Sequence, residues 1–124
     1  MSDVSLQTRL RRAVTEYYDA LDRDDFDAVL RDFSGDVLYR RPGYDPIVGL
    51  EGLRQYYTRD RKLAAGRHVL RAMVAEDNHV AAHGMYEGEL RDGTRRTIGF
   101  AAFFTFDGGG RIVEHSTYFF TPAV

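Results

Sequence analysis

The sequence contains no cysteine. Disulfide bonds and thiolate catalysis are therefore excluded, and the side chains that could bind a metal are reduced to histidine and carboxylate. A chain without disulfides suits a reducing compartment, so we expect a cytoplasmic protein.

The sequence also lacks long apolar runs and a strong excess of charge of one sign. No uninterrupted apolar stretch is long enough to cross a bilayer, and the polar N-terminus has no apolar signal-peptide region. Seventeen basic and 19 acidic residues give a formal net charge of −2. Such a balance gives no strong field to attract nucleic acid or an anionic membrane, so we expect a soluble protein that binds neither.

The first half of the chain has the residue spacing of helices. Apolar residues recur at three- and four-residue intervals between Leu6 and Leu21, which predicts a helix over residues 5–23 with one buried face. The same spacing predicts a shorter helix over 26–33 and a third from about 49 to 64. A short strand over 37–41 lies between them and ends at Pro42, because proline cannot extend a central strand.

After His68 the spacing changes from helical to alternating. Four strands are predicted over 67–75, 79–90, 94–106 and 112–120, joined by turns short enough for hairpins. The length of 124 residues fits one domain over 1–124. This order predicts an α+β fold in which three N-terminal helices pack on one face of a curved antiparallel β-sheet.

The order of these elements resembles the nuclear transport factor 2-like superfamily, and within it the SnoaL-like, ketosteroid isomerase-like group. The segments that support the resemblance are Tyr17–Leu21, Asp24–Val29, Gly49–Tyr57, Gly99–Phe106 and Gly110–His115. The resemblance implies a cone-shaped, cystatin-like sheet with an apolar pocket between the helices and its concave face, and commonly a dimer through the opposite face. Members include ketosteroid isomerases, polyketide cyclases, epoxide hydrolases, dehydratases and proteins without activity, so the fold does not settle the function.

Comparison with the ketosteroid isomerases implies roles for four positions. Tyr17 matches their oxyanion-donating tyrosine, and Tyr57 matches the tyrosine behind it. Their catalytic aspartate is replaced by Arg41, and their protonated oxyanion-hole aspartate by Ala102. Steroid isomerisation by that machinery is therefore not expected, although a tyrosine donor could serve another reaction.

The same comparison implies which strand side chains point into the pocket. In the last two strands these are Ile98, Phe100, Ala102, Phe104, His115, Thr117 and Phe119. In the strand over 79–90, counting back from the turn at Asp92-Gly93 predicts that His83, Met85, Glu87 and Glu89 point inward. A slip of one residue would reverse each assignment, because strand side chains alternate.

On that parity, polar side chains gather inside an aromatic cone. We assign catalysis to Tyr17, Arg41, His83, Glu87 and His115. Burial can bring the pKa values of a glutamate and a histidine together near neutral pH, and a forked, permanently charged arginine could hold an enolate, carboxylate or phenolate. The residues predicted to contact the substrate are Tyr44, Tyr57, Met85, Ile98, Phe100, Ala102, Thr117 and Phe119.

Each charged or imidazole group in this set also has a structural interpretation. Glu87 could simply neutralise Arg41 in a buried ion pair. His115 could be solvated or lie in an interface if the last strand has the opposite parity. His83, which lies between small residues, could be a core histidine with satisfied hydrogen bonds.

The tyrosines and the other histidines have structural interpretations as well. Tyr17 and Tyr57 could be core aromatics whose hydroxyls bond to each other. Tyr44, in the loop after Pro42, could close over the mouth of the pocket or pack on Pro46. His68 and His79 are expected at the surface.

Three functions remain open from the sequence. The first is a cofactor-independent acid/base enzyme, a cyclase, isomerase or dehydratase, acting on a small apolar oxygenated metabolite such as a polyketide or terpenoid. The second is an epoxide-type hydrolase, although the inward aspartates of the Asp-Arg-Asp relay used by such family members are missing. The third is a small-molecule binding protein without catalysis.

The expected partners are the small molecule and a second copy of the chain. Phe103, Tyr118 and Phe120 form an apolar stripe on the face opposite the pocket, which predicts a homodimer. No nucleotide cofactor is expected, because the triple glycine 108–110 is a hairpin turn rather than the opening of a helix. No metal is expected either, since the histidines and glutamate lack ligand spacing.

Overall fold

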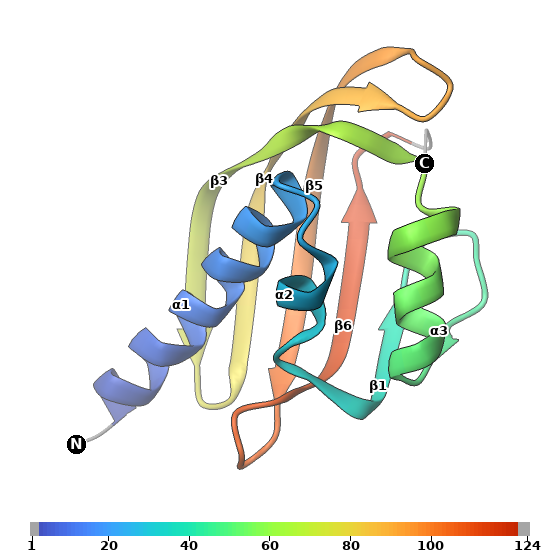
Figure 1. The fold of residues 1–124 in the computed structure, drawn as a ribbon. Helices are drawn as coiled ribbons and strands as arrows, with labels where there is room; N and C mark the ends of the chain where they lie inside the picture. The colour runs from blue at the N-terminus through green and yellow to red at the C-terminus, as the bar shows by residue number, and fades with distance from the viewer. Residues whose placement is uncertain (1–2, 122–124) are drawn as a thin grey trace.

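The computed structural model of the protein describes residues 3–121 as a curved six-stranded sheet with helices on one face (Figure 1). The strands lie in the order β2-β1-β6-β5-β4-β3. The predicted α+β class, with N-terminal helices and a curved sheet, is confirmed. The elements are α1 (Asp3–Asp22), α2 (Phe26–Leu30), β1 (Phe33–Arg40), β2 (Ile47–Val48), α3 (Leu50–Gln55), the π-helix η1 (Tyr56–Asp60), β3 (Leu63–Glu76), β4 (His79–Leu90), β5 (Arg95–Phe106) and β6 (Ile112–Phe119).

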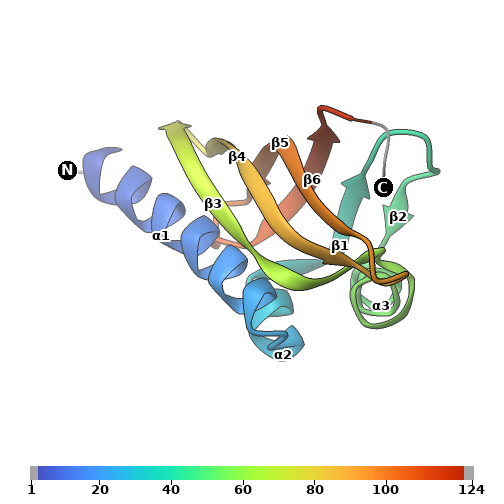
Figure 2. The same cartoon turned by 90° about the horizontal axis from the view of Figure 1, so that it is seen from above.

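Helix α1 has the single buried stripe that the sequence predicts. Leu10, Val14, Tyr17 and Leu21 are each at most 6% exposed and follow one another at three- and four-residue intervals. Seen from above, α1 and α2 lie on one side of the sheet, and no element within residues 3–121 covers the other side of β3–β6 (Figure 2). The helices therefore form one layer over the concave face.

The segment after α2 differs from its prediction. Helix α2 ends at Leu30, and Phe33 already begins β1. The residues Ser34 to Asp36, which have turn chemistry, lie within β1 where its register against β6 shifts between Phe33 and Leu38. Because β1 pairs with β6 in parallel, the sheet is mixed, and the prediction of an antiparallel sheet is wrong for this pair.

The third helix is shorter than predicted and changes type. After six α-helical residues it continues as a π turn, in which the N–H of Arg61 donates to the carbonyl of Tyr56 at 2.8 Å, five residues back. Strand β3 then begins at Leu63, four residues before its predicted start at residue 67. The short strand β2 was not predicted, and it pairs antiparallel with β1.

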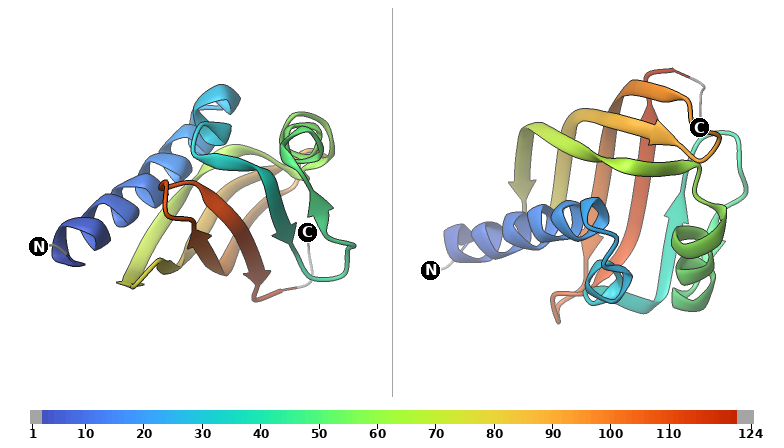
Figure 3. Two further views of the ribbon diagram at one scale, coloured as in Figure 1. Left: turned by 90° about the horizontal axis from the view of Figure 1, so that it is seen from below. Right: turned by 45° about the horizontal axis from the view of Figure 1, so that its top comes forward.

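The sheet bends so that β3 and β4 curl toward α3 (Figure 3). Glycines on β4 permit the close approach of β3 at the bend. A Cβ atom on Gly84 would overlap the carbonyl oxygen of Val69, and one on Gly88 would overlap that of Ala65. The curvature makes the concave face into the wall of an interior site.

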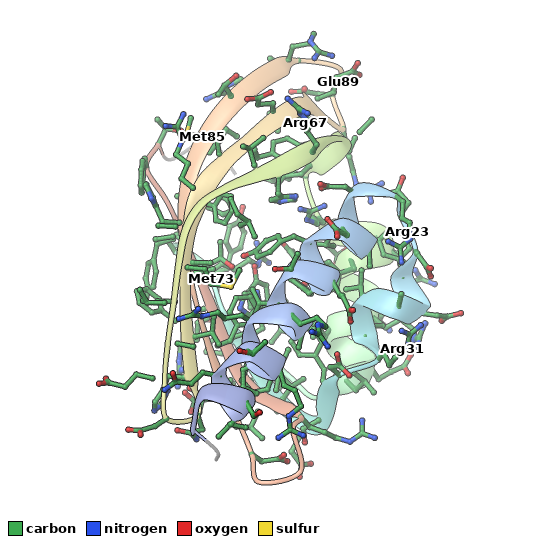
Figure 4. All side chains as sticks on the ribbon, turned by 90° about the vertical axis from the view of Figure 1, so that its left-hand side faces the viewer. Arg23, Arg31, Arg67, Met73, Met85 and Glu89 are labelled. Atoms are coloured by element: carbon green, nitrogen blue, oxygen red, sulfur yellow. The ribbon has the colours of Figure 1, made fainter. Side chains whose placement is uncertain are left out.

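The predicted parity of β4 is wrong. Val80, Ala82 and Tyr86 are at most 3% exposed and point inward, whereas His83, Met85, Glu87 and Glu89 lie on the opposite face. Directly paired residues share a face, and β4 pairs Tyr86 with Ile98 and Ala82 with Ala102. Since Ile98 and Ala102 point inward as predicted, their partners on β4 must do so too. Figure 4 shows Met85 projecting from the sheet on the side away from the helices.

The inward parity predicted for β5 and β6 is confirmed by burial. Ile98, Phe100 and Ala102 are at most 2% exposed, and His115 is 1% exposed. Phe119 is partly buried and packs against both hydrophobic clusters of the interior. Within residues 3–121, no helix has the length and apolar character needed to cross a membrane.

Candidate functional site

An interior cavity lies between α1, the π turn and the concave face of the sheet. Its free space is about 20 Å³, close to the minimum that holds one water molecule. A larger hollow of about 250 Å³ lies between α1 and α2, but most of the charged side chains around it are exposed to solvent. The interior cavity is lined by Tyr17, Tyr18, Leu21, Tyr39, Tyr56, Tyr57, Arg61, Leu63, His68, Tyr86, Phe100, Thr117 and Phe119.

His115 is the buried imidazole beside this cavity. Its Nδ1 lies 3.2 Å from the carbonyl oxygen of Phe103, which can only accept, so Nδ1 carries the proton and Nε2 is an acceptor. The ring is stacked between Phe104 at 4.2 Å and Tyr39 at 4.7 Å. Burial lowers the pKa of His115 to about 3, so the imidazole is neutral at physiological pH.

Two tyrosine hydroxyls form a directed chain to this imidazole. The hydroxyl of Tyr17 lies 3.2 Å from His115 Nε2 and donates to it, because that nitrogen has a lone pair. Tyr17 also bonds to the hydroxyl of Tyr57, which must therefore be the donor in that contact. Burial raises the pKa of both tyrosines, so both hydroxyls keep their protons.

A second hydroxyl pair reaches the same nitrogen from β1 and β6. Tyr39 donates to the Oγ1 of Thr117 at 3.3 Å, and Thr117 Oγ1 lies 3.4 Å from His115 Nε2. The imidazole nitrogen has one lone pair, so Thr117 and Tyr17 compete for it. One of the two hydroxyls can therefore turn to a ligand while the other keeps His115 satisfied.

A third polar group at the cavity was not predicted. Arg61 is 8% exposed, and its Nη2 donates to Nε2 of His68 at 3.4 Å. His68 Nδ1 in turn donates to Oδ1 of Asp22 at 2.7 Å. The prediction that His68 lies at the surface is wrong, since its side chain is 6% exposed. The predicted third helix, from about 49 to 64, included Arg61, and a π turn has no clear pattern in sequence.

The structure does not bring His83 or Glu87 to the cavity. Glu87 Oε1 lies 3.6 Å from Nη2 of Arg67 on the outer face, and the ring of His83 packs on Phe120 with centroids 5.8 Å apart. Met85 faces outward with them. Their predicted inward orientation failed because the parity of β4 is set by its pairing with β5.

Arg41 does not line the interior cavity. Its guanidinium is over the ring of Tyr44 at 3.9 Å and over that of Tyr56 at 4.4 Å. The buried ion pair with Glu87 does not form, since Glu87 is on the outer face. Tyr44 is 44% exposed. Its pKa is lowered mainly by the hydrogen bond and charge of Lys62, and to a smaller extent by Arg41.

The other predicted contact residues divide between the cavity and the core. Phe100, Thr117 and Phe119 line the cavity with Tyr57. Ile98 and Ala102 are fully buried in the hydrophobic interior without lining the cavity. In the part of the chain that the structure describes, no group of three or more histidine or acidic side chains is arranged to hold a metal ion.

Solved structures with the same fold come from several bacteria. An LEH-like epoxide hydrolase of M. tuberculosis has a TM-score of 0.78 and 23% identity over 91% of this chain and 84% of that one. An NTF-2 like protein of unknown function from Burkholderia xenovorans has a TM-score of 0.78 and 20% identity over 94% of this chain and 87% of that one. A ketosteroid isomerase-like protein from Erwinia carotovora has a TM-score of 0.71 and 17% identity over 94% of this chain and 97% of that one. At these identities the likeness establishes the fold alone.

The family follows from the sequence match. No curated protein matches the chain. The family model described as SnoaL-like domain matches residues 14–115, which include α1 from Val14 and the strands up to His115. The protein belongs to the SnoaL-like domain family.

Proposed function

We propose that the protein is an acid/base enzyme that moves a proton on a small apolar carbonyl compound through an enolate. The SnoaL-like fold supports binding of a small molecule. The observation that favours the finer proposal is the hydrogen-bond chain from Tyr57 through Tyr17 to His115 beside the interior cavity.

In the proposed step, the carbonyl oxygen of the substrate takes over the hydroxyl of Tyr17. His115 Nε2, with its lone pair released by both Tyr17 and Thr117, then accepts a proton from the carbon next to the carbonyl. The C–H bond breaks, an N–H bond forms, and the electron pair moves onto the carbonyl oxygen as an enolate. Return of the proton to another carbon gives an isomer, attack on a second carbonyl closes a ring, and loss of water gives dehydration.

The electrostatics of the site suit a step in which two charges arise together. An isolated imidazolium at His115 is disfavoured by burial, which is why its pKa is about 3. An enolate formed in the adjacent cavity attracts that imidazolium in a low-dielectric setting and offsets the burial cost. Tyr17, whose acidity is increased by the bond from Tyr57, is placed to donate to the developing oxyanion.

Exchange of α-hydrogen in D₂O tests this step without knowledge of the natural substrate. Acetophenone, 1-indanone and 2-tetralone would be incubated with the protein, and loss of the α-proton signal would be followed by NMR. We expect Tyr17→Phe to slow exchange by roughly 10² to 10³ and His115→Gln by roughly 10² to 10⁴.

The matched control is His79→Gln, because His79 is exposed and its Nδ1 bonds to Thr105 Oγ1 on the neighbouring strand. This variant should exchange ketones at the wild-type rate. Equal rates in wild type, Tyr17→Phe and His115→Gln would refute the proposed roles.

A binding protein without catalysis is the second candidate. It is favoured by the pKa directions, since burial lowers that of His115 and raises those of Tyr17 and Tyr57, all away from neutrality. Tight binding of a ketone with no exchange above the buffer rate would support it over the enzyme.

An epoxide-type hydrolase has less support. It would need an interior carboxylate to activate water, and the buried polar residues within 3–121 are Arg61, His115 and Thr117. Absence of solvent ¹⁸O from any diol product would eliminate this function.

We also propose that the outer sheet face forms a homodimer. Phe103, Tyr118 and Phe120 are 50%, 49% and 61% exposed on that face, as the sequence predicted, and Val74 adds to the patch at 65%. Sedimentation of wild type and Phe103→Asp tests this. A dimer that becomes a monomer in the variant supports the proposal, and a monomeric wild type at high concentration contradicts it.

A further inference from the structure

We infer that Arg61 is an anchor for a carboxylate, so that the ligands of the interior cavity are small organic acids with an apolar body. This inference rests on the proposed function only in placing a ligand in that cavity. It assigns to Arg61 the anion-holding role that the sequence suggested for Arg41.

Arg61 is a buried cation without an acidic partner. It is 8% exposed, and within the described residues no carboxylate lies within ion-pair distance of its guanidinium. The arginines that do form ion pairs within the described residues have side chains that are 42% to 73% exposed. A buried charge that lacks a partner is costly to folding, so its position is better explained by a ligand that supplies the negative charge.

His68 holds the guanidinium but cannot neutralise it. Asp22 accepts the Nδ1–H of His68 at 2.7 Å on one oxygen and the backbone N–H of His68 at 2.9 Å on the other. Both carboxylate oxygens of Asp22 are thus engaged by His68, and the Nε2 lone pair of His68 accepts from Arg61. Asp22 and His68 are therefore positioning residues, which orient Arg61 while no carboxylate of the described residues contacts its guanidinium directly.

The backbone of Arg61 is fixed on both sides. Its N–H closes the π turn on the carbonyl of Tyr56, and its carbonyl accepts from Nε of Arg91 in the turn between β4 and β5. The N–H of Arg91 also donates to the carbonyl of Lys62 at 2.7 Å. Single π turns frequently occur at functional sites, and a group held in place before binding loses less entropy when a ligand arrives.

Arg61 shares the cavity with the hydroxyl-bearing residues of the proposed step. Arg61, Tyr17, Tyr57 and Thr117 all line it. The positive charge of Arg61 acts against the burial that raises the pKa of Tyr17 and Tyr57, as expected for a cation near both rings. Arginine offers five N–H donors in a fork that matches a carboxylate, and His68 uses one of the hydrogen-bonding groups.

The surroundings define the rest of the ligand. Phe100, Phe119 and Tyr18 give an apolar, largely aromatic wall to the same cavity. An acid whose carboxylate binds Arg61 would place its apolar body against these rings and its carbonyl toward Tyr17. Because the free space is about 20 Å³, the acid must be small and must displace lining side chains on entry.

Matched acids and amides test the anchor directly. Phenylacetate and phenylacetamide, and benzoate and benzamide, have nearly the same shape and differ in charge. Titration of ¹⁵N-labelled wild type should show roughly tenfold to hundredfold tighter binding of at least one acid than of its amide. Arg61→Met should remove this preference, whereas Arg59→Met, which removes an exposed arginine two residues away, should retain it.

Two results would overturn the inference: no acid preference in the wild type for either pair, or a preference that survives in Arg61→Met. If Arg61→Met does not fold, Arg61→Lys replaces it. This variant keeps the charge but loses the fork, so it should weaken acid binding about tenfold while leaving amide binding unchanged. Acid binding at the wild-type level in Arg61→Lys would contradict bidentate binding of the carboxylate by the Arg61 guanidinium.

The same variants separate this inference from the proposed function. Exchange of neutral ketones is tested with Tyr17→Phe and His115→Gln, whereas the preference for an acid over its amide is tested with Arg61→Met. Acid preference in a protein that exchanges no ketone would keep the anchor and remove the enolising step. Ketone exchange without acid preference would support the enolising step and contradict the role of Arg61 as an anchor.

Discussion

The two faces of β4, β5 and β6 carry similar residue types in different surroundings. On the concave face, His115 is buried and stacked between aromatic rings. On the outer face, His83 is exposed and packs on one side against Phe120. Residue type alone therefore does not distinguish the two faces. The environment does, because burial fixes both the protonation state of an imidazole and the partners of its nitrogens.

The largest difference between the faces should appear in stability. Phe104 is 1% exposed and the adjacent Phe103 is 50% exposed on the opposite face. We expect Phe104→Ala to lower the free energy of unfolding by about 3–5 kcal/mol, because it leaves a cavity in the core. Phe103→Ala should lower it by about 1 kcal/mol or less. Urea denaturation of both variants checks this, and equal losses would contradict the assignment of faces.

The pH dependence of stability should report the buried imidazole. The pKa of His115 is about 3 when folded, well below the ordinary histidine value. Between these pKa values the imidazole is protonated in the unfolded chain and neutral in the folded chain. The free energy of unfolding therefore decreases as pH falls from about 6.5 toward 3. The slope from this residue approaches about 1.4 kcal/mol per pH unit.

Comparison with His115→Gln isolates that contribution from the carboxylates, which titrate in the same range. Denaturation at pH steps should show a shallower loss of stability in the variant than in wild type. Parallel curves for the two proteins would contradict a neutral, buried His115.

The smallest effect is expected at Glu87 on the outer face. Glu87 pairs with Arg67 at 3.6 Å, and both side chains are well exposed. Glu87→Gln should change the free energy of unfolding by less than about 1 kcal/mol, because solvent screens such pairs. Ketone exchange should be unchanged. A large loss of exchange in this variant would return Glu87 to the candidate site and would contradict the structure-based assignment.

The sequence predicted most of the fold because local spacing determines it. The stripe through Leu10, Val14 and Tyr17 needs only helical periodicity, and the alternation in β5 and β6 needs only a period of two. The parity of β4 failed because it depends on which residue of β5 each residue meets. That register places Tyr86 opposite Ile98, one residue away from the predicted count.

The candidate site was predicted in part for the same reason. Tyr17, Tyr57 and His115 were found through family resemblance and meet as expected. Arg61 and His68 were missed, because their positions follow from a π turn and from an early start of β3. Both are decided by contacts with Asp22 and Arg91, which are distant in sequence.

The protonation and partners of His115 test the account most directly. Imidazole ¹⁵N shifts measured from about pH 4 to 8 cover the range in which an ordinary histidine titrates. We expect His115 to stay neutral with the proton on Nδ1 throughout, and its Nε2 signal to shift in Tyr17→Phe because a donor is lost. A His115 that becomes protonated near its ordinary pKa, or whose Nε2 signal is unaffected by Tyr17→Phe, would contradict the proposed chain.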